Sequence, residues 1–204
     1  MLSPMVAIAG ARDSAEGFAS LTKACYIPEG GHARERMCAP GKMVTVKDTK
    51  PDGAEQRLRR LGVQLPAPST PFGSYQEARQ TGSLLFLSGM LPVEDHKPKY
   101  VGQIGKELDA DAGRDAARLA ALNALAAAKQ HLGSLDHVSR VVRLGVFMAT
   151  FGDFFDQPGV ADGASDLLRD IFGSEKMPVR SVIGVASLPL GVPIELDLIF
   201  EVTN

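Results

Sequence analysis

The stretch MPVRSVIGVASLPLGVPIELDLIFEV, residues 177–202, decides the fold of this chain. Its first part is rich in β-branched residues and its last part alternates apolar with polar side chains, so both parts predict β-strands. A turn rich in Pro and Gly joins them. Arg180 lies near the start of the first strand in apolar company, and Glu195 lies in the second.

An arginine on an apolar strand needs an anionic partner, because an unpaired charge is costly to remove from water. In the first strand Arg180 shares a face with Val182, and in the second strand Glu195 faces away from Ile194 and Leu196. If the two strands pair as a hairpin, Arg180 and Glu195 fall on a shared face. Two interpretations stay open: a cross-strand ion pair, which the pattern alone favours, and a grip on the carboxylate or phosphate of a ligand.

Composition limits the class of protein. The chain has 204 residues, 45% of them apolar, and a formal net charge of -2. This balance argues against a nucleic-acid-binding surface, because no basic excess is available to neutralise phosphates. No apolar run of about 18 residues occurs, so we expect no membrane-spanning helix. A cytoplasmic location is predicted.

No metal or cofactor is expected. The chain has two cysteines, Cys25 and Cys38, and no CxxC pair. We favour two free thiols over a disulfide between them, as in a cytosolic protein. The four histidines are not spaced as metal ligands, and neither a GxGxxG motif nor a P-loop is present.

Two regions differ in pattern. Residues 1–52 predict an irregular extension: basic residues outnumber acidic ones there, as in a transit peptide, but Asp13 and Glu16 interrupt that pattern. A mitochondrial location would follow if this segment were a transit peptide. Residues 53–204 predict one domain of the α+β class.

The elements expected in this domain follow a short helix and have the order β-β-α-β-α-β-β. Two helices should pack on one face of a mixed sheet. The expected ranges are a short helix at 55–61, strands at 75–79 and 84–88, an Ala-rich helix at 112–132 capped by Asp109 or Asp111, a strand at 138–149, a helix at 161–172 and the two C-terminal strands.

Several segments together resemble one known family. They are PFGSY at 71–75, GSLLFLSG at 82–89, NAL at 123–125, Arg180-Ser181, Leu188-Pro189 and Glu195, over a match from about 61 to 202. The chain is similar in these segments to the Rid/YjgF family of enamine/imine deaminases, older members of which are called endoribonuclease L-PSP proteins. The segments GASDLL at 163–168 and ASLPLGVPIE at 186–195 look like a divergent branch, many of whose members have no assigned activity.

The resemblance implies a chorismate-mutase-like fold, a homotrimer, and ligand sites in the clefts between subunits. It implies that Arg180 binds the carboxylate of a 2-aminoacrylate-type substrate and that Glu195 positions or activates water. Tyr75, Ser88, Gly89 and Val182 would line the site. The reaction would be hydrolysis of a C–N bond, giving a 2-keto acid and ammonia.

Three positions depart from the family pattern. Val182 stands where cysteine is frequent, Met90 where glutamine is frequent, and the loop over residues 151–159 differs. These departures leave the expected binding of a carboxylate in place and bear on the substrate and on turnover. The second hypothesis is therefore a non-catalytic trimer that binds small carboxylates or 2-keto acids. Ribonuclease activity is the weakest hypothesis, because the chain lacks a basic stripe.

Overall fold

The computed structural model describes residues 52–203, so both cysteines and the predicted extension up to residue 51 lie outside the described part. A five-stranded sheet has the order β1-β2-β7-β5-β6. Its strands are β1 (Ala78–Thr81), β2 (Leu84–Leu87), β5 (Val138–Ala149), β6 (Val179–Val185) and β7 (Ile194–Val202). β5 and β6 run parallel and the other neighbours antiparallel, which confirms the mixed sheet.

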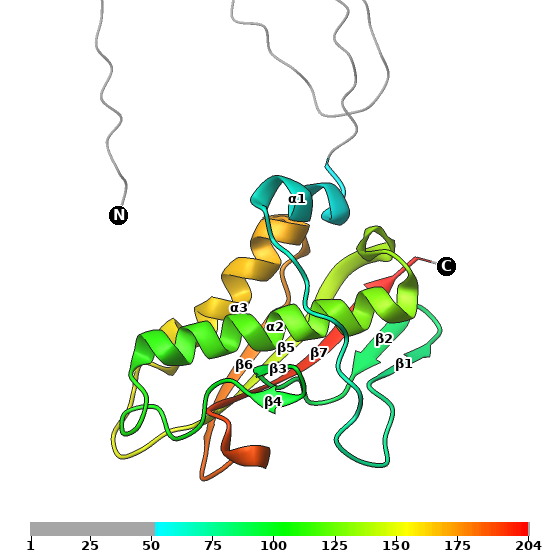
Figure 1. Cartoon of the computed structure of the whole chain (residues 1–204). Coiled ribbons are helices and arrows are strands. Elements are labelled where there is room, and N and C mark those ends of the chain that lie inside the picture. The colour runs from blue at the N-terminus through cyan, green and yellow to red at the C-terminus, as the bar shows by residue number, and fades with distance from the viewer. Residues whose placement is uncertain (1–51, 204) are drawn as a thin grey trace, which may run out of the picture. The chain divides into compact units, whose positions relative to one another are not determined.

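Two long helices cover one face of this sheet, as Figure 1 shows. They are α2 (Ala110–Leu132) and α3 (Gln157–Phe172). The alternation predicted for β7 is confirmed, because Ile194, Leu196 and Leu198 are fully buried under the helices. The expected α+β architecture is therefore present, and within residues 52–203 no helix covers the other face of the sheet (Figure 1).

Alanine sets the distance between α2 and its neighbours. Ala116, Ala120 and Ala124 recur at four-residue spacing along α2 and are fully buried. Small side chains let the helix axis come close to the sheet. The helix begins after Asp109, whose carboxylate accepts a hydrogen bond from the Ala112 N–H at 2.8 Å, so Asp109 is the cap and Asp111 is not.

The shorter elements connect this core. Helix α1 (Ala54–Leu61) ends at Gly62, which takes the left-handed conformation with φ 65° that favours glycine. A two-stranded ribbon pairs β3 (Val93–Glu94) with β4 (Lys97–Pro98). Three 3₁₀ turns are η1 (Leu135–His137), η2 (Ser174–Lys176) and η3 (Pro189–Gly191).

Two predicted boundaries were wrong. The first strand begins at Ala78, so Tyr75 lies in the preceding loop, where its N–H bonds to the Gly73 carbonyl in a tight turn. Helix α3 begins at Gln157, four residues earlier than predicted, with Pro158 in its first turn, where the missing N–H costs nothing.

The predicted hairpin of the last two strands was also wrong. β6 and β7 are separated by β5, which pairs with both. A parallel neighbour needs a crossover, and here α3 supplies the crossover from β5 to β6. The turn between β6 and β7 therefore spans the width of β5.

Within residues 52–203, no helix is long and apolar enough to cross a membrane.

Candidate active site

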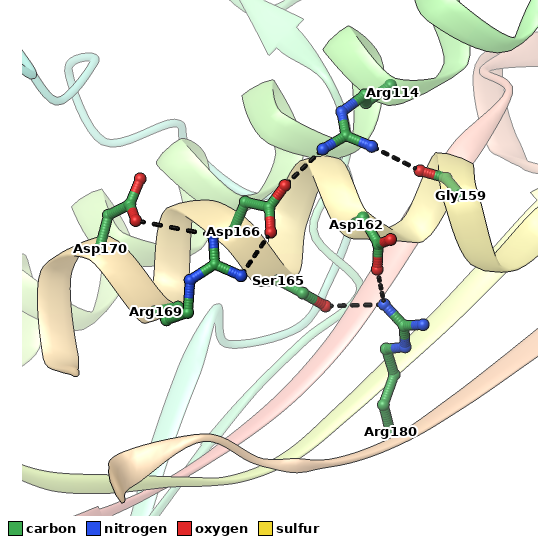
Figure 2. A network of polar contacts seen from close by, with 8 residues as sticks. All are labelled: Arg114, Gly159, Asp162, Ser165, Asp166, Arg169, Asp170 and Arg180. Carbon is green, nitrogen blue, oxygen red and sulfur yellow. Dashed lines mark hydrogen bonds and ion pairs between the residues drawn. The ribbon is translucent and has the colours of Figure 1, made fainter. Parts of the chain in front are cut away.

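Arg180 lies on the outer strand β6 and points toward helix α3. Its Nη1 donates to the Asp162 carboxylate at 2.6 Å and to the Ser165 hydroxyl at 2.9 Å, as Figure 2 shows. Asp162 and Ser165 are three residues apart, so they lie on the same face of the helix. The anion that the sequence required for Arg180 is thus Asp162 rather than Glu195.

The neighbouring charges on α3 have other partners. Asp166 pairs with Arg114 of α2 and with Arg169 at 2.8 Å. Arg114 also donates to the Gly159 carbonyl at 2.9 Å, and Arg169 reaches Asp170 at 3.8 Å. Figure 2 shows these pairs along one side of the helix. Asp162 is therefore the carboxylate that acts on Arg180.

Glu195 lies on β7 and faces away from the helices, half-buried on the open face of the sheet. Burial removes water from its carboxyl group and raises the pKa of Glu195 above the ordinary value of 4.5. A carboxylate whose pKa is raised is a stronger base than an ordinary glutamate, which suits it to accept a proton from water.

Gly89 makes room for this carboxyl group. A Cβ built on Gly89 would overlap Oε1 of Glu195. The two residues meet because Met90 and Leu196 exchange backbone hydrogen bonds of 2.8 and 2.9 Å, which fix the segment after β2 alongside β7. The structure thus brings together two of the predicted site residues, Gly89 and Glu195.

Arg180 and Glu195 lie on opposite faces of the sheet, so the predicted shared face was wrong. In the register, Arg180 is beside Leu144 and Glu195 is opposite Phe147. Leu144 and Phe147 are three residues apart on β5, and an odd separation places side chains on opposite faces. Moreover, adjacent strands lie about 4.8 Å apart, so two steps across β5 add about 10 Å. One small acid cannot contact both side chains of one chain.

The remaining predicted residues divide between these regions. Val182 shares the face of Arg180 and packs, partly buried, against the apolar core. Ser88 donates its backbone N–H to the Glu77 carbonyl at 2.9 Å, beside Gly89. Tyr75 is exposed, and its hydroxyl accepts from the Phe72 N–H at 3.1 Å.

Sequence reasoning missed Asp162 and Ser165. One signal was available: Ser165 interrupts the apolar stripe of α3 that includes Ala161, Ala164 and Leu168. It is only 8% exposed, and a buried hydroxyl requires a hydrogen-bond partner. A buried serine facing a strand that carries one arginine could have been matched to that arginine.

The described residues also contain an open groove of about 540 Å³ that none of the predicted site residues line. It lies between α1, the segment after it and the second half of α2. Its lining residues are Glu55, Leu58, Arg59, Val63, Gln64, Leu65, Pro66, Pro68, Ala126, Lys129 and Gln130. Arg180 and Glu195 therefore lie outside this groove.

Within residues 52–203, no group of three or more His, Cys, Asp or Glu side chains is arranged to hold a metal ion.

Known proteins share this fold. Residues 55–201 match the family model described as "YjgF/chorismate mutase-like, putative endoribonuclease". The chain belongs to the YjgF family. A crystal structure from Shewanella oneidensis MR-1, described as that of "a putative endoribonuclease", has a TM-score of 0.71 and 33% identity, covering 74% of this chain and 100% of that one.

Two curated YjgF relatives differ in what their names state. Protein TCP17 of Trypanosoma cruzi is 40% identical over 148 residues, which are 72% of this chain and 92% of that protein, and its name gives no activity. The 2-iminobutanoate/2-iminopropanoate deaminase of Dermatophagoides farinae is 30% identical over 138 residues, 67% of this chain and 92% of that protein.

Proposed function

We propose that this YjgF protein is an enamine/imine deaminase that hydrolyses 2-aminoacrylate-type intermediates to 2-keto acids and ammonia. The observation that carries the proposal is the guanidinium of Arg180, anchored through Nη1 alone. Its Nε and one N–H of Nη2 form the parallel pair of donors that matches a carboxylate. The relative named as a deaminase of 2-imino acids supports the same class of substrate.

Glu195 supplies the proton transfers in this proposal. After the enamine tautomerises to the iminium, water attacks C2 and the Glu195 carboxylate accepts a proton from that water. Glu195 returns this proton to the nitrogen of the tetrahedral intermediate, the C–N bond breaks and ammonia leaves. The hydroxyl oxygen becomes the ketone as its proton passes to solvent, which balances the proton that C3 took up in the tautomerisation. The raised pKa of Glu195 favours the uptake of the proton from water.

We further propose that the working form is a homotrimer whose site takes Arg180 from one protomer and Glu195 from the next. The support is geometric, since the two side chains lie on opposite faces of one sheet and are separated by β5. A cleft between copies can bring the helix-facing edge of β6 against the open face of a neighbouring sheet. Holding substrate and water there would itself lower the barrier, because orientation replaces a bimolecular encounter.

The alternative function is binding of small carboxylates without turnover. It is favoured by Val182, which offers no polar group beside Arg180 and packs against the core instead. The same Arg180 grip would serve that function, so binding alone does not separate the two.

The decisive experiment measures turnover. A serine dehydratase generates 2-aminoacrylate, and rapid mixing follows the formation of pyruvate with wild type and with Arg180→Ala. We expect wild type to accelerate pyruvate formation and the variant to lose at least 90% of that acceleration, since an arginine–carboxylate pair contributes about 1.5–3 kcal/mol or more. Arg169→Ala is the matched control, because Arg169 pairs with Asp166 and Asp170 and not with Arg180.

The results of this experiment separate the two functions and test the role of Arg180. Saturable binding of 2-ketobutyrate without any acceleration would support the binding alternative and reject the deaminase. Acceleration that survives in Arg180→Ala would remove Arg180 from the mechanism.

A further inference from the structure

We propose that Asp162 determines ligand selectivity at Arg180, making the site favour the zwitterionic 2-iminium acid over the anionic 2-keto acid product. The inference rests on the proposed function and adds to it a preference between substrate and product. It assigns a role to a residue that neither the sequence pattern nor the family resemblance singled out.

The contacts divide the guanidinium into two edges. Both N–H groups of Nη1 point at α3, to Asp162 at 2.6 Å and to Ser165 at 2.9 Å. The opposite edge, made by Nε and Nη2, is the one left for a ligand carboxylate. The Arg180 side chain is 27% exposed, so part of it is reachable from outside the chain. A bound ligand would therefore place a second carboxylate on a guanidinium that already carries one.

Among the acidic side chains of α3, Asp162 is the one whose charge acts on Arg180. Asp166, one turn further along α3, is held by Arg114 and Arg169, and Arg169 also reaches Asp170. Figure 2 shows that these pairs lie along the helix beyond Asp162. The Arg180–Asp162 pair is therefore neutral before any ligand binds.

Because the Arg180–Asp162 pair is neutral, it discriminates between the zwitterionic and the anionic form of a ligand. The 2-iminium acid carries one negative carboxylate and one positive nitrogen, so it adds no net charge to the neutral Arg180–Asp162 pair. Hydrolysis takes up one water and releases ammonium, and the remaining keto acid has a single negative charge. Two carboxylates on one guanidinium repel each other, and the repulsion grows as water is excluded from the site. Asp162 thus favours the protonated imine, the form that water attacks, and weakens retention of the product.

The test compares two ligands with the same three-carbon skeleton. Pyruvate carries a ketone at C2 and L-alanine carries an ammonium group there. Binding of each to the full chain is measured by NMR titration, which detects weak affinities. We expect Asp162→Asn to tighten pyruvate about fivefold and to change the affinity for alanine less than twofold, because the variant keeps an acceptor for Nη1 but removes the charge.

Two control variants separate charge from structure. Asp170→Asn removes the same charge from a similarly exposed position on α3 (46% against 45% for Asp162) and should leave both affinities unchanged. Ser165→Ala removes a neutral contact to Nη1 and should weaken the binding of both ligands by the same factor. Circular dichroism melting of each variant checks that the fold is retained.

The outcomes distinguish this inference from the proposed function. If Arg180→Ala abolishes binding while Asp162→Asn changes both ligands equally or neither of them, the selectivity role of Asp162 is rejected and the Arg180 grip stands. If Arg180→Ala binds pyruvate and alanine as wild type does, or if wild type binds neither, the grip itself fails and this inference fails with it.

Discussion

The carboxyl group of Glu195 lies directly over the backbone of Gly89, in the space that any side chain at residue 89 would fill. The contact joins two segments more than a hundred residues apart in sequence, and it sits beside the hydrogen bonds between Met90 and Leu196. Glycine is required here by close approach rather than by a left-handed backbone, since Gly89 has no positive φ.

Gly89→Ala should therefore displace Glu195 and destabilise the fold. We expect a loss of about 1 kcal/mol in the free energy of unfolding, the low end for overpacked sites, because the atoms met are the end of a flexible side chain that can move. Chemical denaturation measures this loss. In a background of Glu195→Ala the same substitution should cost far less, because the atoms that the new Cβ would meet are gone. Equal costs in the two backgrounds would show that the contact does not explain the glycine.

Glu195→Gln should change how stability depends on pH. Below the ordinary pKa of 4.5 the carboxyl group is protonated in both folded and unfolded chains, so it adds no penalty. As pH rises through the raised pKa of the folded state, the half-buried group must ionise, and wild type loses stability that glutamine keeps. Over this pH window the stability of the variant relative to wild type should increase, and above it the difference in stability should stay constant.

Denaturation curves from about pH 4 to about pH 8 check the Glu195→Gln prediction, since the window opens just above the unfolded pKa. A difference between variant and wild type that is constant with pH would contradict the burial of this carboxyl group.

The elements were predictable from local pattern, and the pairing of the strands was not. The strand at Val138–Ala149 was predicted at its observed limits because its β-branched run is long and unambiguous. The start of α3 was missed because Pro158 and Gly159 weaken the helical pattern there. Gly163, inside the predicted range, has a packing reason, because a Cβ at this position would overlap the Arg114 carbonyl where α3 crosses α2.

Sheet order could not be deduced from adjacency in sequence. β6 and β7 follow each other along the chain, but β5 lies between them, which moves Arg180 and Glu195 to opposite faces. The alternation of side chains along each strand was predicted correctly. The faces that two strands share depend on which strands pair and in what register, and local pattern does not give this. The partner of Arg180 was missed for the same reason, since Asp162 comes from the crossover helix.

Asn123 fixes the β3 segment to helix α2, and its loss should be costly. Its side-chain amide is buried and donates to the Leu91 and Val93 carbonyls at 2.8 and 2.9 Å. Asn123→Ala leaves two buried carbonyls without donors, at about 1–3 kcal/mol each, so we expect a total loss of about 2–6 kcal/mol. Gln130→Ala, at an exposed position of the same helix, is the control, and urea denaturation of both variants measures the difference. A loss no larger than that of the control would mean that water replaces the amide.

The open face of the sheet should be an interface between copies of this chain. Ile183 of β6 is 47% exposed on that face, and Phe86 of β2 is 38% exposed there. β6 is also an edge strand, whose unpaired backbone groups invite a partner. If three copies cover this surface, light scattering should give about three chains for wild type, and Ile183→Glu should shift the protein toward the monomer, because a charge would be buried in an apolar contact.

Leu61→Glu provides the matched control for Ile183→Glu. Leu61 lies on α1 and is 44% exposed, so it carries nearly the same exposed apolar surface away from the sheet. The control should keep the trimer and full turnover, whereas Ile183→Glu should lose both, since the proposed site takes Arg180 and Glu195 from different protomers. A monomeric Ile183→Glu that keeps wild-type turnover would reject the shared site, and a monomeric wild type would reject the trimer.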